Sequence, residues 1–520
     1  MLVRRSAFVS AAPATVGLEG LRLSEVGGPA GAPAALSTSL SRTAFPDSAP
    51  SDSFVRVLPA FGGKLPQGCS RRLSQAPSRQ SSRRGFGTQP TPAVSRPGSA
   101  ISGSAARAVV AASCDSTTSP VGYALPPADS CTWAWDTAPG ATGLQAAPDA
   151  AFVRTLSVVR YGGVPTIFAG GRFSTSGGRR LENIGWRDGR EWQSIIADSS
   201  SASVPGRVNA MAVAKFSLFI GGEFAGGLLE WDGRSDPNVV NSNGVEGRAL
   251  NGSVRGMMPT KFWGSTADGR DYLWLVGDFD GVPGYEGELP GYAWYDGQYY
   301  GSVEGLSAPH GASVVAESES GNGIYLGGAR FDVEGLGSAT GVLYFGSGGE
   351  VSSLGNGIVG FRQIDAILAI NDLMYVAGDF DGVAHDGVVV PDTAFMAAWD
   401  GRRWRSVGVF DGPVRALAAV NAHVPGATKP APTTPSEVWA GGEFRAVDGV
   451  TFNGLSRRVE SHWLKVGGAG WPGVAGGVSA LAQLGFVVWV GGGFAAVNAG
   501  RVRNVAALSC GGRGAKRGPL

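Results

Sequence analysis

The chain has 520 residues, of which 83 are glycine, 43% are hydrophobic and only 16% are charged. The hydrophobic fraction is large enough for a substantial core, which excludes disorder over the whole length, and glycine has no period of three, which excludes collagen. A formal net charge of +1 argues against a general nucleic-acid-binding protein.

Residues 1–113 differ from the rest of the chain. They hold 13 Lys and Arg against four Asp and Glu, are rich in Ser, Ala and Pro, and have neither helical nor strand periodicity. We expect a disordered basic head here, because such a segment buries too little apolar surface to offset its ordering entropy, followed by a linker over residues 114–130. The composition is similar to that of a plastid or other organellar transit peptide, but a mispredicted start or a genuine disordered tail also explains it.

One pattern returns seven times after residue 150. It consists of an apolar-aromatic run, a glycine pair (a single glycine in the third and fifth copies), an acidic or variable residue and a phenylalanine; the phenylalanines are Phe173, Phe224, Phe279, Phe331, Phe380, Phe444 and Phe494. Successive copies are 49 to 64 residues apart. A sustained period near 50 indicates a repeat architecture rather than a string of unrelated domains.

Each copy carries further strand signals in a fixed order. A short apolar strand precedes the glycine pair, an aromatic-Asp-Gly turn such as Trp399-Asp400-Gly401 follows it, and a later tryptophan such as Trp404 opens a fourth strand. Asp-Gly between two apolar runs is typical of a hairpin, since glycine accepts the positive φ of a tight turn. The pattern predicts an all-β fold, a seven-bladed β-propeller of four-stranded antiparallel blades over residues 131–510, with residues 511–520 as a basic tail.

These motifs resemble the Kelch or galactose-oxidase type of propeller blade. The combination of Gly-Gly-x-Phe with Asn-x-x-x-Trp-Asp-Gly-x-x-Trp is closer still to the fungal cortical polarity-marker family and to similar bacterial secreted repeat proteins. The fourth copy departs most, with Tyr344-Phe345-Gly346 in place of the turn. The resemblance covers residues 131–510 and implies a fold rather than an activity, because propellers host many unrelated functions.

The two ends of the repeat region complement each other. The seventh copy stops after its third strand, residues 504–508, and residues 131–136 carry the tryptophan expected of a fourth strand. We therefore expect the N-terminal strand to complete the last blade and close the ring. This placement puts Cys131 opposite Cys510, and a disulfide between them indicates an oxidising compartment; two free thiols are the alternative.

Residues 477–497 are apolar and uncharged over a length that could span a membrane. They also contain the seventh copy of the repeat and three consecutive glycines, which are poor material for a helix interior. The pattern therefore predicts blade strands and no transmembrane segment.

Two sets of carboxylates have different expected roles. The aspartates of the turns are expected to bond their own backbone; they are Asp188, Asp232, Asp296 and Asp400. The residue before the repeat phenylalanine is acidic in four copies, as Glu223, Asp278, Asp379 and Glu443. Equivalent positions lie at equivalent radii, so these groups form a partial carboxylate ring that is either a cation site or a set of solvated strand ends.

Ligand binding is expected on the face that carries the second-to-third loops and the connections between blades. Two of these loops are enlarged, residues 280–291 and residues 381–395, and the third copy concentrates tyrosine. The candidate ligand-binding residues are Tyr285, Glu286, Tyr292, Tyr299, Tyr300 and His385. Exposed tyrosines stack on sugar rings or grip a protein partner, and the alternative is that these aromatics pack between blades.

Enzyme chemistry finds little support in the sequence. The four histidines are scattered over different copies, and no nucleophile elbow, phosphate loop or metalloprotease motif occurs. We expect a monomeric, non-enzymatic binding or scaffold module without a cofactor, secreted or at the cell surface, that recognises a protein or a glycan and no nucleic acid. Two alternatives are a propeller enzyme or carbohydrate-binding protein with its site at the enlarged loops, and an organellar scaffold delivered by the basic head.

Overall fold

The computed structural model describes residues 132–135, 143–146, 151–196, 204–214, 216–241, 245–260, 272–284, 288–303, 305–421, 436–466, 473–497 and 502–511. These residues form strands, turns and loops and contain no helix. The expected disordered head, the linker, and residues 512–520 of the expected tail lie outside the described residues. The prediction of an all-β chain is confirmed for the described part.

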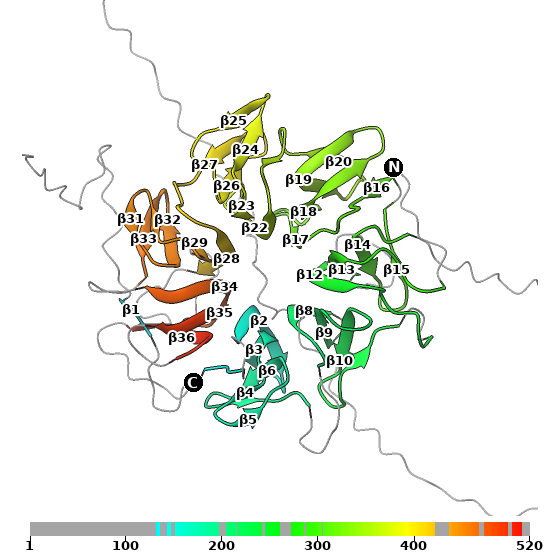
Figure 1. Ribbon diagram of the computed structural model, residues 1–520, viewed down its shortest axis with the longest axis vertical. Helices are drawn as coiled ribbons and strands as arrows, with labels where there is room; N and C mark the ends of the chain where they lie inside the picture. The colour runs from blue at the N-terminus through cyan, green and yellow to red at the C-terminus, as the bar shows by residue number, and fades with distance from the viewer. Residues whose placement is uncertain are drawn as a thin grey trace, which may run out of the picture. The chain divides into compact units, whose positions relative to one another are not determined.

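Antiparallel four-stranded sheets make up most of the structure (Figure 1). We name each sheet by its innermost strand. The first three are the β2 sheet, with β2 (Phe152–Tyr161), β3 (Val164–Arg172), β6 (Ile184–Arg187) and β7 (Trp192–Gln193); the β8 sheet, with β8 (Val208–Ala214), β9 (Ser217–Gly222), β10 (Leu228–Trp231) and β11 (Asn238–Val239); and the β12 sheet, with β12 (Ser253–Thr260), β13 (Tyr272–Asp278), β14 (Tyr292–Tyr295) and β15 (Tyr300–Gly301).

The following sheets repeat this design. The β17 sheet has five strands, β16 (Leu306–Ser307), β17 (Val314–Glu317), β18 (Gly323–Val333), β19 (Gly337–Gly346) and β20 (Val351–Ser353). The β22 sheet has β22 (Gln363–Ile370), β23 (Leu373–Asp379), β26 (Met396–Trp399) and β27 (Trp404–Ser406). The β28 sheet has β28 (Val414–Asn421), β29 (Ser436–Gly442), β32 (Leu455–Val459) and β33 (His462–Lys465).

The last sheet combines strands from both ends of the described chain. It has the order β1 (Thr132–Trp135), β36 (Val505–Gly511), β35 (Val487–Val497) and β34 (Val474–Leu484). The apolar run at residues 477–497 lies in β34 and β35, so its interpretation as strands is confirmed. No helix in the described part of the chain could cross a membrane.

The register of this sheet bears on the expected disulfide. Trp133 is the partner of Cys510, and Thr132 is the partner of Gly511. Cys131 lies outside the described residues. The register therefore places a tryptophan directly opposite Cys510, and the disulfide stays a prediction.

The strand that names each sheet, called its first strand below, lies innermost and contacts the first strands of the two neighbouring sheets (Figure 1). Each inner strand contacts the next in the order β2, β8, β12, β17, β22, β28 and β34, and β34 contacts β2. This arrangement of radial antiparallel sheets is that of a β-propeller. Polar side chains of the inner strands donate to backbone carbonyls of the next sheet: Asn209 Nδ2 lies 3.1 Å from the Val254 oxygen, and Ser479 Oγ lies 2.5 Å from the Val153 oxygen, which joins the last sheet to the first.

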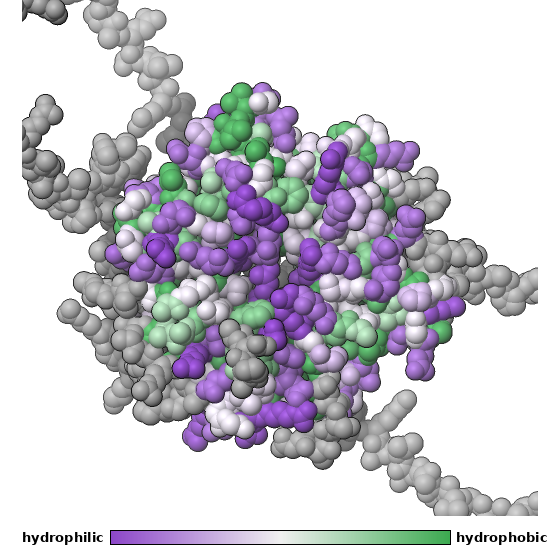
Figure 2. Space-filling view, viewed as in Figure 1, coloured by the Kyte–Doolittle hydropathy of each residue, from purple (hydrophilic) through white to green (hydrophobic). Residues whose placement is uncertain are grey.

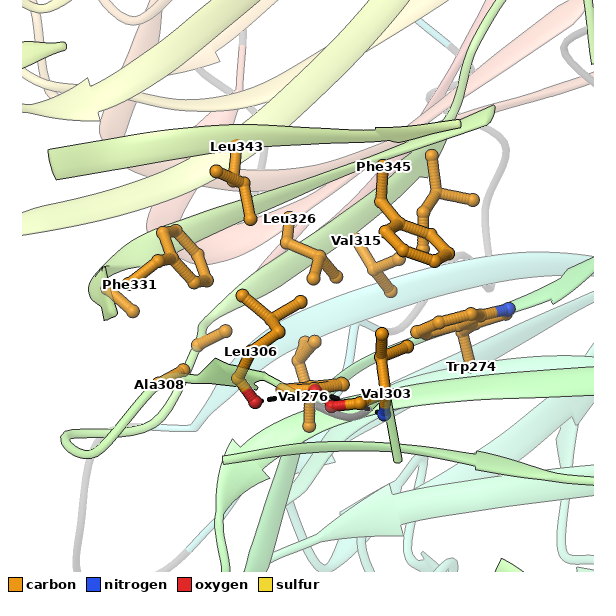
Figure 3. Close-up of a cluster of buried hydrophobic side chains, with 14 of the residues drawn as sticks. Trp274, Val276, Val303, Leu306, Ala308, Val315, Leu326, Phe331, Leu343 and Phe345 are labelled. Carbon is orange, nitrogen blue, oxygen red and sulfur yellow. Dashed lines mark hydrogen bonds between the residues drawn. The ribbon is translucent and has the colours of Figure 1, made fainter. Parts of the chain in front are cut away.

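The core is divided into clusters, and each lies between two neighbouring sheets. The cluster between the β12 and β17 sheets is an example, in which Trp274 and Phe345 are fully buried with ring centroids 6.1 Å apart (Figure 3). A further cluster joins Val153 and Trp192 of the β2 sheet to Trp489 of the β34 sheet. Apolar burial is therefore what holds neighbouring sheets together.

Three of the connections between second and third strands contain a small hairpin. The hairpins are β4 (Thr175–Ser176) with β5 (Arg179–Arg180), β24 (Gly382–His385) with β25 (Val388–Val390), and β30 (Ala446–Val447) with β31 (Val450–Thr451). Strand β21 (Ile358–Val359), in the connection between the β17 and β22 sheets, pairs with β24. The second-to-third loops and the connections between sheets therefore share one face, as the sequence predicted.

The aspartates of the Asp-Gly turns have the structural role predicted for them. Asp400 Oδ1 accepts the backbone N–H groups of Arg402 and Arg403, each at 2.9 Å, and Asp188, Asp232 and Asp296 make the same pair of bonds. Partial burial raises the pKa of Asp400, but the N–H groups of Arg403 and Arg402 and the Arg405 guanidinium outweigh it and lower the pKa to about 2.

We expect Asp400→Asn to flatten part of the acid dependence of stability. The folded pKa is below the unfolded value, so the carboxylate stabilises the protein fully above about pH 4 and loses this effect as the pH falls toward 2. The variant should cost about 1 kcal/mol at pH 6, allowing for solvent screening, and only a small part of that at pH 2, where the folded carboxyl group is about half protonated. Urea unfolding at both pH values checks this, and an equal cost at both would contradict it.

Candidate functional site

A set of polar residues faces the axis of the propeller because the inner strands bulge at equivalent places. The register shifts between Val153 and Thr155, and corresponding shifts occur in β8, β12, β22, β28 and β34. The residues skipped by these shifts are Arg154, Asn209, Arg255, Asp365, Arg415 and Ser479. A bulge bends the strand and re-aims its extra side chain, which explains why polar residues interrupt otherwise apolar strands.

These bulges lie at one end of the propeller. In all six sheets the residue before the bulge pairs with the glycine at the second position of the repeat's glycine pair, as Val254 pairs with Gly277. This glycine lies at or next to the end of the second strand in every sheet except the last, where β35 continues beyond it. The second-to-third loops and the connections between sheets leave from the same end, whereas the Asp-Gly turns lie at the other. Strongly hydrophilic residues gather around the centre of the face seen in Figure 2. We call the bulge residues, together with the charged residues beside the starts of the innermost strands and the ends of the second strands, the axial cluster.

A buried carboxylate links three sheets within the axial cluster. The side chain of Asp365 in β22 has no exposed surface; its Oδ1 lies 3.0 Å from Arg154 Nη2 of β2, and its Oδ2 lies 2.8 Å from Arg415 Nη1 of β28. The Asp365 carboxylate accepts a third hydrogen bond from Gln363 Nε2, which lies 2.6 Å from Oδ1. Burial lowers the pKa of Arg415, but Asp365 and Glu443 outweigh it and raise the pKa above its usual value.

Every member of the predicted carboxylate ring is paired with an arginine. Glu223 contacts Arg207, Asp278 lies 2.5 Å from Arg255, Asp379 lies 2.7 Å from Arg362, and Glu443 lies 3.3 Å from Arg415. Arg362 also contacts Asp381 at 2.9 Å. Among the described residues, no three His, Cys, Asp or Glu side chains come together as a metal site would need. The cation site stays a prediction, and in the structure the four carboxylates form ion pairs with arginines.

The tyrosines proposed as ligand-binding residues divide into three groups. Tyr292 and Tyr300 are buried in the core, so their expected exposure is wrong: Tyr292 Oη bonds the Val303 and Leu306 oxygens, and Tyr300 Oη bonds the Val240 oxygen. Burial raises the pKa of both hydroxyls. They pack between sheets because each ring fills a core cluster while its hydroxyl meets a backbone acceptor.

The remaining candidates lie at the surface or outside the described residues. Tyr299 is half-buried in the Asp-Gly turn, where its N–H bonds Asp296, and that turn is at the end opposite the axial cluster. Tyr285 and Glu286 lie outside the described residues. His385 ends β24, with Nε2 3.6 Å from Asp386 Oδ2 and its ring 5.9 Å from that of Trp399. The structure therefore brings His385 near none of the other candidates that it describes.

The motifs of the sequence do not single out the axial arginines and Asp365. A signal for them exists, because in six copies a buried Val or Ile in the first strand is followed directly by the bulge residue. These pairs are Val153-Arg154, Val208-Asn209, Val254-Arg255, Ile364-Asp365, Val414-Arg415 and Val478-Ser479. Each bulge residue differs in chemistry from the next, so the position repeats while the residue type does not.

No protein-family model and no curated protein matches the chain. Among solved structures it is similar to the extracellular domain of BT4673 from B. thetaiotaomicron, at 11% identity and a TM-score of 0.44, with 72% of this chain and 39% of that chain covered. It is also similar to BBS1N, crystallised in complex with ARL6DN, at 10% identity and a TM-score of 0.42, with 75% and 99% covered. A third is a catalytically inactive virginiamycin B lyase from Staphylococcus aureus with quinupristin, at 8% identity and a TM-score of 0.35, with 72% and 99% covered. The chain thus spans about two fifths of the BT4673 domain structure.

Proposed function

We propose that this protein is a non-enzymatic, seven-bladed β-propeller that acts as a binding or scaffold module, secreted or at the cell surface. Its blades are the sheets named above, and the pairing of β1 with β36 supports closure of the last blade by the N-terminal strand. The Kelch-type and polarity-marker assignment rests on the glycine-pair and Trp-Asp-Gly motifs. The partner is a protein or a glycan that docks on the face carrying the axial cluster.

The observation that carries this proposal is the position of the axial cluster. Its charged side chains stand on the inner strands, directly before them, or at or beside the ends of the second strands paired with them. The inner strands are held on both sides by neighbouring sheets, and the cluster lies at the end from which the long connections leave. Rigid elements that present a fixed set of charges are suited to recognition, because little entropy is lost when the partner binds. The burial of Tyr292 and Tyr300 removes two of the candidate tyrosines for stacking on a sugar ring. The carbohydrate-binding alternative at the enlarged loops then rests on Tyr285 and His385.

We expect Arg362→Glu to abolish partner capture, because it reverses a charge on the face with the axial cluster, where the Arg362 side chain is 54% exposed. Arg402→Glu is the matched control, since Arg402 is exposed in an Asp-Gly turn at the other end. Affinity capture from the source organism with both variants and the wild type, quantified by mass spectrometry, checks this. Equal loss with both variants, or with neither, would speak against the assigned face.

A further inference from the structure

The charges of the axial cluster are divided unevenly around the axis. The β2, β8 and β12 sheets, with the residues that directly flank their first and second strands, contribute four arginines and two carboxylates, namely Arg154, Arg172, Arg207, Arg255, Glu223 and Asp278. The β22 and β28 sheets contribute two arginines and four carboxylates, namely Arg362, Arg415, Asp365, Asp379, Asp381 and Glu443. We call the four arginines of the first group the basic crescent.

The backbone brings the basic crescent together on one side of the axis. Arg172 ends β3 and is the register partner of Phe152, two residues before the Arg154 bulge. The Arg207 guanidinium lies 5.7 Å from the centre of the Phe152 ring. Burial lowers the pKa of Arg207, and repulsion from Arg154, Arg172 and Arg255 lowers it further, as expected for like charges in close proximity.

The carboxylates of the axial cluster occupy only some of the N–H groups of the arginines in the basic crescent. Arg154, Arg207 and Arg255 each face a carboxylate through Nη2, which leaves further N–H groups of each guanidinium for a second acceptor. Their side chains are 29%, 39% and 43% exposed, so a small ligand can reach them from solvent. Arg154 shares its carboxylate, Asp365, with Arg415, which weakens the neutralisation on the crescent side.

We propose that the basic crescent binds an oxyanion of the phosphate type, as the free ion or as a phosphate monoester. Guanidinium groups match tetrahedral oxyanions with forked, charge-assisted hydrogen bonds, and several converging forks favour a multivalent anion over a carboxylate. The inference rests on the proposed function, since it names the ligand chemistry of the same face. An anion held there relieves the repulsion among the four arginines and stabilises the folded state.

Titration of the full chain with inorganic phosphate, phosphoserine and acetate, by calorimetry and by thermal unfolding at constant ionic strength, tests the proposal. We expect saturable binding and a rise in Tm of about 2 °C or more with phosphate or phosphoserine but not with acetate. Tighter binding of inorganic phosphate identifies a free-ion site, and tighter binding of phosphoserine identifies a site for a phosphorylated ligand. No saturable heat with the wild-type protein, or equal effects of acetate, would overturn it.

Variants locate the site. Arg207→Gln with Arg255→Gln should reduce the affinity for phosphate at least about tenfold, because two guanidinium groups that each donate charge-assisted hydrogen bonds to the anion are lost. Arg190→Gln with Arg402→Gln, in Asp-Gly turns at the other end, removes the same net charge and should leave the affinity unchanged. A loss of affinity that is equal in both pairs would show only general electrostatic attraction and overturn the site. If phosphate fails to bind but Arg362→Glu still abolishes capture, the proposed function stands and this inference falls.

Discussion

Replacing Gly378 by alanine is expected to lower the free energy of unfolding by about 3 kcal/mol, the upper end of the usual cost of overpacking. A Cβ atom at Gly378 would overlap the carbonyl oxygen of Gln363, on the strand that carries the Asp365 bulge. The neighbour is backbone rather than the end of a flexible side chain, so relief requires the bulge itself to move. Urea unfolding followed by tryptophan fluorescence measures the effect.

The same clash explains the second glycine of the repeat motif. At Gly171, Gly222, Gly277, Gly442 and Gly492 a Cβ would also meet a carbonyl oxygen near the start of the first strand. Gly281→Ala is the matched control, because a Cβ there has no neighbour within 4 Å and the backbone is not left-handed; its cost should stay within about 0.5 kcal/mol. If Gly378→Ala were as stable as this control, the link between the glycine and the bulge would be wrong.

Asp365→Ala is expected to destabilise the protein by about 3 kcal/mol, because it leaves the Arg154 and Arg415 guanidiniums without their shared carboxylate. We place the cost at the lower end for a broken buried pair, since both arginine side chains keep some contact with water, at 29% and 17% exposure. The bond between Arg154 and Asp365 joins residues 211 positions apart and so links the first and fifth sheets along the chain. Thermal unfolding measures the loss.

Glu443→Gln provides the control for this result. Glu443 also pairs with Arg415, but its side chain is 55% exposed, so its removal should cost about 1 kcal/mol or less. Asp365→Asn keeps the shape of the side chain without its charge, so its loss of unfolding free energy should lie between those of Asp365→Ala and Glu443→Gln. A cost for Asp365→Ala no larger than for Glu443→Gln would mean that the buried carboxylate does not hold the three sheets together.

The sequence by itself determined the local structure of the repeats. Apolar runs bounded by glycine pairs and Asp-Gly turns predicted the strands and their order, because strand pairing within a sheet is set by neighbouring segments and by turn chemistry. The role of Asp400 and its equivalents also followed from the sequence, since an aspartate in such a turn bonds N–H groups only two and three residues away.

The tertiary structure alone decided what surrounds the axis. Tyr292 and Tyr300 belong to the core because their hydroxyls meet carbonyls 11 to 60 residues away, and a list of tyrosines in one copy cannot show which of them do so. The four repeated acids belong to ion pairs because arginines near the starts of first strands reach them. Asp365 meets Arg154 only when the sheets form a ring, so its role depends on a contact that no local pattern encodes.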